Sequence, residues 1–268
     1  MSLSPEERHK HCTLARRAAE EAGRLQLSYY RRDGLLVEHK EDESPVTAAD
    51  RESEAMLRER LLQHTPEYGM LGEEYGAEGD QVRRWILDPL DGTQNFIRGL
   101  DAFAVLMALE LVGVLEVGVV HAPALETTWW AVREGGAFRQ GPNEAEPAPL
   151  KTRTLYTLAE AALAFGSVHL VAHDEAGWQG FRRLAQHVAY SRGLGDWQGH
   201  MLVAEGKLDV MLDPQVAIHD VAPIALIVRE AGGAFQALDG SMRHDQGSAV
   251  TAANEALANA ARQHLHGE

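Results

Sequence analysis

Trp85–Phe96 reads Trp-Ile-Leu-Asp-Pro-Leu-Asp-Gly-Thr-Gln-Asn-Phe, and we expect the rest of the chain to be organised around this stretch. Its first three residues are apolar and predict the end of a buried strand. Pro89 has a restricted φ and no amide hydrogen, so we expect it to stop the strand. It would thereby hold the carboxylates of Asp88 and Asp91 in a set relation to each other.

The pair Gly92-Thr93 predicts the start of a helical turn, where free backbone amides favour an anion. Two carboxylates would repel an anion bound at this helix start unless a cation lay between them. We therefore infer a cation site at this turn. The alternative is that an acidic turn containing Asp-Gly is an ordinary solvated bend, and these twelve residues do not separate the two interpretations.

Composition and charge restrict the partners of the chain. Its 268 residues, 45% hydrophobic and 24% charged, are typical of a globular protein with a sizeable core, built as one large domain or two small ones. The formal charge of −15 argues against nucleic acid or an anionic membrane as a partner. It would also repel a phosphorylated substrate, unless bound divalent cations reversed the local field.

We expect neither a membrane span nor a signal peptide. The sequence has no apolar stretch of the required length, about 20 residues, and residues 1–30 are too charged for a signal peptide. The single cysteine, Cys12, cannot form an internal disulfide, which suits a reducing cytoplasm. Because Cys12 lies in an amphipathic helical pattern, we interpret it as a small buried side chain.

The first half predicts two helices and then a series of strands. Residues 4–7, Ser-Pro-Glu-Glu, have the spacing of a capping box with proline in the first turn. Residues 47–50, Thr-Ala-Ala-Asp, predict a second helix start. We expect helices over 5–30 and 48–64, and strands over 35–40, 68–71, 85–87, 104–111, 115–121 and 127–132.

The second half predicts alternating helices and strands. We expect helices over 175–187, 196–205, 221–231 and from 254 onward, and strands near 188–191, 208–212, 234–235 and 248–251. Residues 144–149 are the best candidate for a subdomain junction and are too short for a flexible linker. The whole chain therefore predicts a layered mixed α/β (α+β) fold, forming a single catalytic domain over 1–268 with subdomains 1–149 and 150–268.

Four acidic residues share one pattern, a strand end or helix start beside glycine or proline. They are Glu73, Asp88, Asp91 and Asp220. Magnesium takes carboxylate oxygens at about 2.1 Å, and acids from separate elements could hold two ions about 4 Å apart across a phosphoryl group. The alternatives are that Asp220 is only a helix N-cap and that Glu73 is solvated.

Three ordered motifs resemble the inositol monophosphatase family. They are Gly72-Glu73-Glu74, then Asp88-Pro89-Leu90-Asp91-Gly92-Thr93-x-Asn95-Phe96, and then Asp220-x-Ala222-Pro223 with Glu230-Ala231-Gly232-Gly233. The resemblance covers nearly the whole chain, because residues 47–50 and 252–254 also fit. It implies a magnesium-dependent, lithium-sensitive phosphatase with the layered α-β-α-β-α sandwich of the inositol monophosphatase and fructose-1,6-bisphosphatase type, and it leaves a homodimer open.

The resemblance also implies which residues hold the metal ions. Glu73 and Asp88, with the carbonyl of Leu90, would hold the first Mg²⁺. Asp88, Asp91 and Asp220 would hold the second. Glu73 would reach a third, more weakly bound ion through water, so two to three ions are expected.

The reacting groups follow from the same resemblance. Asp50 and Thr93 would orient the attacking water, and the amides of Gly92 and Thr93 would hold the phosphate of a small phosphorylated metabolite. The chemistry would be in-line attack by metal-activated water, without a covalent protein nucleophile. One departure is His219, where many family members carry tryptophan, and it leaves the local packing open.

The substrate is expected to be set by loops of the second half. The segment that opens Gly195-Asp196-Trp197 resembles the histidinol-phosphatase branch of the family, and Asp213 lies where that branch has a substrate-contacting acid. Histidinol phosphate carries an ammonium and an imidazole, whereas inositol is a neutral polyol, so carboxylates at Asp196 and Asp213 favour histidinol phosphate. The alternative is that Asp196 is a helix cap and Asp213 a turn residue.

Other functions stay open at this point. Within the family they are inositol-1-monophosphatase and a broad-specificity sugar or 3′(2′),5′-bisphosphate nucleotide phosphatase. Outside it, Gly193-x-Gly195-x-x-x-Gly199 resembles the dinucleotide-binding loop of an oxidoreductase, although the strand predicted before it is short and polar. A catalytically inactive metal-binding protein is the last alternative.

Overall fold

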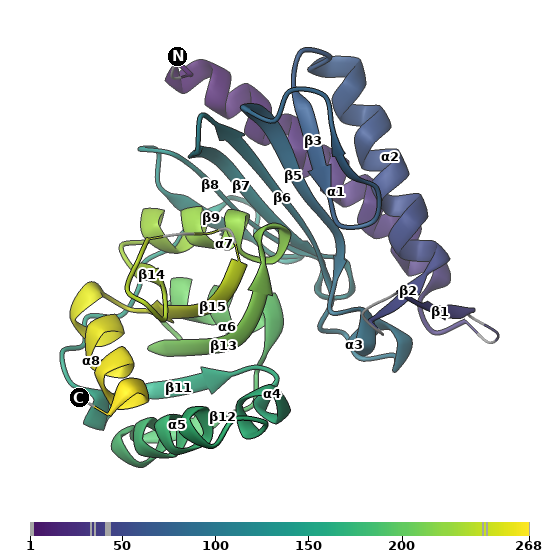
Figure 1. Ribbon diagram of the computed structural model, residues 1–268. Helices are drawn as coiled ribbons and strands as arrows, with labels where there is room; N and C mark the ends of the chain where they lie inside the picture. Colours follow the sequence, from purple (N-terminus) through teal and green to yellow (C-terminus); the bar gives the residue numbers. More distant parts are fainter. Residues whose placement is uncertain are drawn as a thin grey trace.

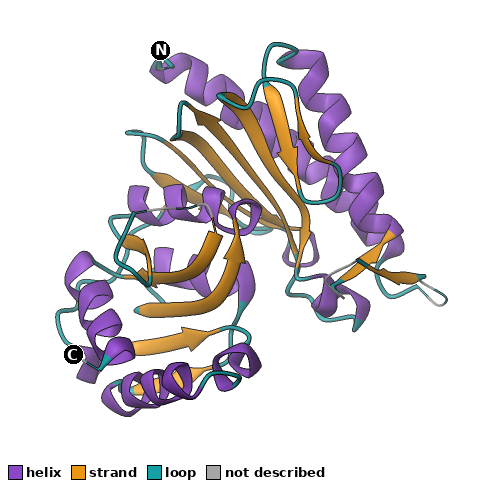
Figure 2. Ribbon diagram, viewed as in Figure 1, coloured by secondary structure: helices purple, strands orange, loops and turns teal. Residues whose placement is uncertain are grey.

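The computed structural model describes residues 3–32, 34, 36–40, 44–242, 244 and 246–267. These residues form five stacked layers in the order helix, sheet, helix, sheet, helix (Figures 1 and 2). The predicted layered sandwich is therefore confirmed. No helix in the described ranges combines the length and the apolar character needed to cross a membrane.

The first layer consists of α1 (Pro5–Tyr29) and α2 (Ala48–His64), which begin where the sequence predicts. At the start of α1, the Ser4 hydroxyl accepts a hydrogen bond from the Glu7 amide, and the Glu7 carboxylate accepts one from the Ser4 amide. Small side chains of α1, among them Cys12, are buried against the large sheet together with Leu57 and Leu61 of α2.

The large sheet has eight strands in the order β10-β9-β8-β7-β6-β5-β3-β4. β3 and β5 are parallel, and the other neighbours are antiparallel. A separate hairpin pairs β1 (Val37–His39) with β2 (Pro45–Thr47). The strands of the large sheet are β3 (Gly69–Gly72), β4 (Gly76–Glu78), β5 (Arg83–Asp91), β6 (Ala104–Leu111), β7 (Val114–Ala122), β8 (Thr127–Val132), β9 (Ala137–Gln140) and β10 (Ala148–Pro149).

Both faces of this sheet are covered, which explains why its central strands β6, β7 and β8 are buried along nearly their whole length. On β6, Met107 and its alternate neighbours pack towards α1 and α2, whereas Leu106 and its alternate neighbours pack towards α7 (Ile218–Glu230). The contact with α7 is close. A Cβ on Gly118 of β7 would lie 2.7 Å from the carbonyl oxygen of Pro223, so this position requires glycine.

The second half builds the small sheet, with strands in the order β12-β11-β13-β15-β14. Helices α6 and α7 lie between the two sheets, and α5 and α8 cover the outer face of the small sheet (Figure 1). The bounds are β11 (Ala162–Phe165), β12 (Tyr190–Arg192), β13 (Val210–Ala217), β14 (Ala234–Ala237), β15 (Gln246–Ala252), α3 (Thr93–Ile97), α4 (Val168–Ala172), α5 (Glu175–His187), α6 (Asp196–Ala204) and α8 (Glu255–His266), with 3₁₀ turns at Pro123–Leu125 and Leu158–Glu160.

The predictions that Pro89 ends a strand and that the strand near 208–212 stops before Pro214 are both wrong. β5 continues beyond Pro89 to Asp91, and β13 continues beyond Pro214 to Ala217. In both strands the register shifts at the proline, between Asp88 and Asp91 in β5 and just after Asp213 in β13. An extra residue in a bulge is not required to donate to the ladder, so proline fits there.

The prediction for Asp220 also needs a correction, because this residue is not the N-cap of α7. The helix begins at Ile218 with Ala217 as its N-cap, and Asp220 accepts a hydrogen bond from the Ala217 amide at 2.7 Å. Asp220 is thus the third residue of the helix.

The strand predicted over 35–40 is shorter in the structure. It is β1, at Val37–His39, and Leu35 lies outside the described residues.

Residues 144–149 lead from one sheet to the next layer without a free linker. β10 adds to the edge of the large sheet by pairing with β9, and the chain then crosses to α7, where the Thr152 amide donates to the carbonyl of Ala231. The junction is therefore hydrogen-bonded at both ends.

Candidate active site

The end of the large sheet next to α7 gathers the predicted acids. β3 and β5 run parallel, with Gly72 opposite Leu87, so the residues that follow are neighbours at the same edge. The Glu73 amide donates to the carbonyl of Leu87, which fixes Glu73 beside Asp88. The parallel pairing of β3 with β5 thus places Glu73, which follows one strand, beside Asp88 in the other.

Asp88 lies at the centre of the cluster and is 1% exposed. One of its carboxylate oxygens lies within 4.8 Å of one from Glu73, the charge of Asp220 also acts on it, and Oδ1 accepts a hydrogen bond from the Leu90 amide at 2.9 Å. One oxygen of Asp88 is therefore tied to the turn that carries the Leu90 carbonyl.

A small cavity of about 70 Å³ continues from this cluster between the two sheets. It is lined by four acids, Asp91, Asp196, Asp213 and Asp220. Asp91 is held by the start of α6, because its Oδ2 accepts a hydrogen bond from the Trp197 amide at 3.1 Å. The cavity thus joins two of the predicted metal ligands with both of the predicted substrate-binding residues.

Within the described residues, Lys40 pairs with Glu73 and His219 lies beside Asp220, but Asp88 and Asp91 form no ion pair with a lysine or arginine. Burial, reinforced by the charges of Glu73 and Asp91, raises the pKa of Asp88 well above its ordinary value. Burial is also the first cause of the raised pKa of Asp91 and Asp220, and it raises the pKa of Asp213 to about 8. A bound cation would reverse these shifts. The oxygen donors suit Mg²⁺, and the residues therefore fit the metal that the motifs imply.

Asp50 and Thr93 are in contact, although they lie on different elements. Asp50, in the first turn of α2, accepts hydrogen bonds from the amide and the hydroxyl of Thr47, and the Thr93 hydroxyl lies 3.1 Å from Asp50 Oδ1. The same hydroxyl is 3.0 Å from the carbonyl oxygen of Leu90. It has one proton to donate, so it can switch between Asp50 and Leu90.

Gly92 sits in the left-handed region with φ +88° and precedes α3. A Cβ at this position would lie 2.6 Å from the carbonyl oxygen of Ala102, so both the backbone angle and the contact require glycine. The turn brings the amides of Gly92 and Thr93 next to Asp91 at the beginning of the helix.

Neither alternative explanation of the two substrate-binding candidates fits the structure. Asp196 does not cap α6, whose N-cap is Gly195 without a side-chain hydrogen bond. Its Oδ2 instead accepts from the Asn95 side chain at 3.1 Å, and its φ of +54° is unusual for a residue other than glycine. Asp213 is a buried residue inside β13, where it faces the cavity.

Sequence reasoning missed two residues that support the acidic cluster. Glu54 is fully buried and accepts hydrogen bonds from the amides of Glu74 and Tyr75, so it fixes the turn that carries Glu73. Glu54 lies four residues after Asp50, on the same face of α2, and this spacing could have revealed it. Lys40 donates to Glu73 Oε1 at 2.8 Å, and nothing in its charged sequence context singles it out.

The glycine-rich loop at 193–199 is explained by packing. A Cβ on Gly199 would lie 2.4 Å from the carbonyl oxygen of Leu194 and 2.5 Å from the sulfur of Met211, so glycine allows α6 to approach the small sheet. The loop follows β12, a three-residue strand at the edge of that sheet. In a dinucleotide-binding unit the glycine-rich loop follows the first strand of a βαβ unit, and a three-residue edge strand does not match that arrangement.

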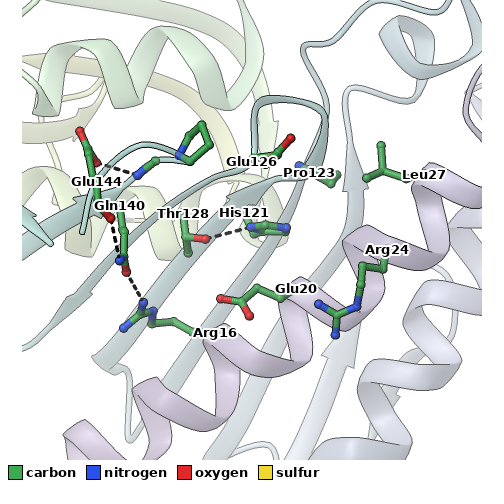
Figure 3. A pocket seen from close by; sticks show the side chains of 12 residues that line it. Arg16, Glu20, Arg24, Leu27, His121, Pro123, Glu126, Thr128, Gln140 and Glu144 are labelled. Atoms are coloured by element: carbon green, nitrogen blue, oxygen red, sulfur yellow. Dashed lines mark hydrogen bonds between the residues drawn. The ribbon is translucent and has the colours of Figure 1, made fainter. Parts of the chain in front are cut away.

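A larger cavity of about 470 Å³ lies elsewhere, beside α1 and strands β7 and β8 (Figure 3). It is lined by residues other than the predicted site residues. Its walls are held by hydrogen bonds between His121 and Thr128 and between Arg16 and Gln140. Size alone therefore does not identify the active site, and the chemistry points to the small acidic cavity.

Comparison with known proteins gives a consistent result. The model of the inositol monophosphatase family matches residues 7–267. A histidinol-phosphatase from Mycobacterium tuberculosis is 39% identical over 249 residues, or 90% of this chain and 93% of the relative. An inositol-1-monophosphatase from Rhizobium meliloti is 34% identical over 81% of each chain. The crystal structure of the suppressor protein suhB from Bartonella henselae superimposes with a TM-score of 0.84 at 30% identity, over 94% of this chain and 97% of the other. The chain belongs to the inositol monophosphatase family.

Proposed function

We propose that this protein is a Mg²⁺-dependent phosphomonoester hydrolase whose substrate is histidinol phosphate. The observation that carries the proposal is the shared cavity, in which the carboxylates of Asp196 and Asp213 face those of Asp91 and Asp220. Asp91 and Asp220 would serve the metal-dependent phosphate chemistry. Asp196 and Asp213 would bind a cationic alcohol. The histidinol-phosphatases among the relatives, at 35–39% identity, support the same assignment.

The proposed metal ligands are Glu73, Asp88, the Leu90 carbonyl, Asp91 and Asp220. Their raised pKa values support this role, because carboxylates that are costly to ionise together become stable when divalent cations lie between them. When bound, two or three Mg²⁺ ions would polarise the phosphate and activate a water molecule. Inhibition by lithium is expected for the same site.

Asp50 and Thr93 would orient the attacking water. The Thr93 hydroxyl accepts a hydrogen bond from that water while it donates its own proton to Asp50 Oδ1, 3.1 Å away. Asp50 is itself held by the amide and hydroxyl of Thr47, so the pair is rigid before the substrate arrives. Glu73 would assist through its contact with Asp88.

The Gly92 and Thr93 amides would hold the phosphate. The left-handed conformation of Gly92 turns the chain at this point, and the first turn of α3 follows immediately. Amide donors at a helix start suit the negative oxygens that gain charge in the transition state. The leaving alcohol would then lie towards the cavity with Asp196 and Asp213.

Asp196 and Asp213 would bind the ammonium and imidazole of histidinol. The carboxylate of Asp196 is fixed by Asn95, and Asp213 is held inside a buried strand, so both are preorganised. Charge-assisted hydrogen bonds to a cation are about twice as strong as neutral ones. A neutral polyol gains less from the same two acids.

Inositol-1-monophosphatase is the second candidate, supported by the 34% identity to the Rhizobium meliloti enzyme. The experiment is a comparison of kcat/KM for histidinol phosphate, inositol 1-phosphate and a 3′,5′-bisphosphate nucleotide, with Mg²⁺ and after EDTA. We expect histidinol phosphate to be preferred at least about tenfold, which corresponds to 1.4 kcal/mol of selective binding. Equal or reversed values would favour the second candidate, and EDTA-resistant turnover would contradict the metal assignment.

We also propose that residues 1–268 act as a single catalytic domain, because the cluster draws residues from both halves. The hydrogen bonds from Trp197 to Asp91 and from Asn95 to Asp196 cross between them.

A cytoplasmic location and a homodimer remain predictions from the sequence. Gel filtration with light scattering would test the dimer.

A further inference from the structure

His219 lies in the first turn of α7, immediately before Asp220, with its side chain 19% exposed. One of its ring nitrogens and one carboxylate oxygen each from Glu73 and Asp88 lie within 4.8 Å of one another. The three residues come from the end of β3, from β5 and from α7. The fold thus brings an imidazole into the group of oxygen atoms that is proposed to hold the first ion.

We propose that His219 is a nitrogen ligand of the metal ion held by Glu73 and Asp88, which makes this a mixed nitrogen and oxygen site. The inference rests on the proposed function, because it requires the metal centre. Two ligands on opposite sides of one ion, each at about 2.1 Å, are about 4.2 Å apart. Atoms within 4.8 Å of one another therefore need only a small closure to share an ion.

The present contact of His219 is consistent with this role. Its Nε2 lies 3.2 Å from Asp220 Oδ1, so the ring points at a carboxylate that is itself a proposed ligand. The backbone of both residues is fixed, because the other oxygen of Asp220 accepts from the Ala217 amide. A rotation of the imidazole towards Glu73 and Asp88 would exchange this contact for a metal bond.

The nitrogen ligand changes which metal the site prefers. Imidazole is a ligand of transition metals and suits zinc, copper, iron and nickel best. Mn²⁺ prefers oxygen but belongs to the same transition-metal series, so it accepts a nitrogen ligand more readily than Mg²⁺, which is bound almost entirely by oxygen. A protein with His219 should therefore bind Mn²⁺ more tightly, relative to Mg²⁺, than the same protein without the imidazole. A side chain that only supports the fold would change both affinities alike.

The test uses the full-length protein with Mn²⁺ as the probe. Pulsed EPR on the Mn²⁺-loaded protein measures the coupling of directly bound ¹⁴N, and labelling with ¹⁵N-histidine shows whether this nitrogen belongs to histidine. Titration calorimetry gives the dissociation constants of Mn²⁺ and Mg²⁺. The variants are His219→Gln and His219→Trp, and the matched control is His173→Gln at the exposed C-terminal end of α4.

We expect bound ¹⁴N in the wild type and in His173→Gln, and its loss in both His219 variants. The Mn²⁺ dissociation constant should rise at least about tenfold in those variants, with a smaller change for Mg²⁺. Mn²⁺ binding without bound nitrogen, or an equal loss of both metals, would overturn the inference and leave the proposed function intact. No binding of Mn²⁺ to the wild type would contradict the proposed metal centre itself. The spectrum of the wild type decides the matter even if a variant does not fold.

Discussion

The carboxylate of Asp91 accepts a hydrogen bond from the backbone amide of Trp197, with 3.1 Å between Oδ2 and N. Asp91 ends a strand of the large sheet, and Trp197 lies in the first turn of α6 in the second half of the chain. A second hydrogen bond, from the Asn95 side chain to the Asp196 carboxylate, also joins the two halves. The acidic cavity is therefore complete only when the two halves are docked, which couples folding to the proposed metal centre.

The first prediction concerns Asp91→Asn. The amide oxygen of asparagine can still accept from Trp197, so the fold should be kept while the charge is lost. A metal ion stabilises a phosphoryl-transfer transition state by several kcal/mol, so we expect kcat/KM with Mg²⁺ to fall about a hundredfold or more. Phosphate release and circular dichroism are the measurements. Asp101→Asn, at an exposed pair with Arg31, is the control, and unchanged turnover in Asp91→Asn would contradict the site.

The second prediction separates the hydroxyl of Thr93 from its methyl group. Thr93→Ser keeps the donor to Asp50 Oδ1, and we expect it to retain activity within about tenfold of the wild type. Thr93→Ala removes the donor, so kcat should fall about a hundredfold while KM changes little. Steady-state kinetics measures both. If the two variants behave alike, the hydroxyl does not orient the water.

Local signals predicted much of the fold. Both long helices of the first half begin at side-chain caps, and the strands over 104–111 and 127–132 have the predicted bounds. These features depend on neighbouring residues, so the sequence contains them. The predicted ends of the two strands that contain proline were wrong, because they depend on residues that are distant in the sequence. Whether Pro89 ends a strand depends on the register of the facing β6, which no local pattern encodes.

The site was predictable to a similar extent. The acids and glycines stand in recognisable motifs, but the support of Glu73 depends on partners that are distant in sequence. Glu54 holds the turn after Glu73 from α2, and Lys40 reaches Glu73 from beyond β1. Such contacts follow from the packing of complete elements, which a single sequence does not specify.

The third prediction concerns substrate choice and uses Asp196→Asn. Asp196 has a φ of +54°, a conformation that asparagine tolerates better than alanine, so Asp196→Asn tests the charge with less strain than Asp196→Ala. The loss of a charged hydrogen bond costs about 1.5–3 kcal/mol. We expect kcat/KM to fall at least about tenfold for histidinol phosphate and less for inositol 1-phosphate. An equal fall for both substrates would remove Asp196 as a specificity residue.

The fourth prediction tests the support of Glu73 through Gly72→Ala. A Cβ on Gly72 would lie 1.9 Å from Glu54 Oε1, so the buried carboxylate would have to leave the amides of Glu74 and Tyr75. We expect a loss of about 1–3 kcal/mol in the free energy of unfolding, with weaker Mg²⁺ binding. Urea unfolding and calorimetry measure these. In Gly193→Ala the new Cβ would meet Phe165 at an ordinary 3.6 Å, and a similar loss there would contradict the explanation.

The fifth prediction concerns acid stability and the buried His121, whose Nδ1 contacts Thr128 Oγ1 at 2.9 Å. Burial, aided by the charge of Arg24, lowers the pKa of His121 to about 4. The unfolded chain, with an ordinary histidine pKa of about 6.5, therefore binds the proton more readily than the native protein between these values. Its contribution to stability is complete above about pH 6.5 and is lost as the pH falls towards about 4, by at most about 3 kcal/mol.

This loss can be isolated by comparing the wild type with His121→Gln, because both proteins share every carboxylate whose pKa is raised. The glutamine does not titrate, so the free energy of unfolding of the variant, relative to the wild type, should rise as the pH is lowered from 7 to 4. Urea unfolding at a series of pH values gives this difference directly. The same pH series with His173→Gln, which replaces an exposed histidine, serves as the control for the substitution itself. A constant difference for His121→Gln would mean that His121 is protonated equally in both states, and that its burial does not limit stability in acid.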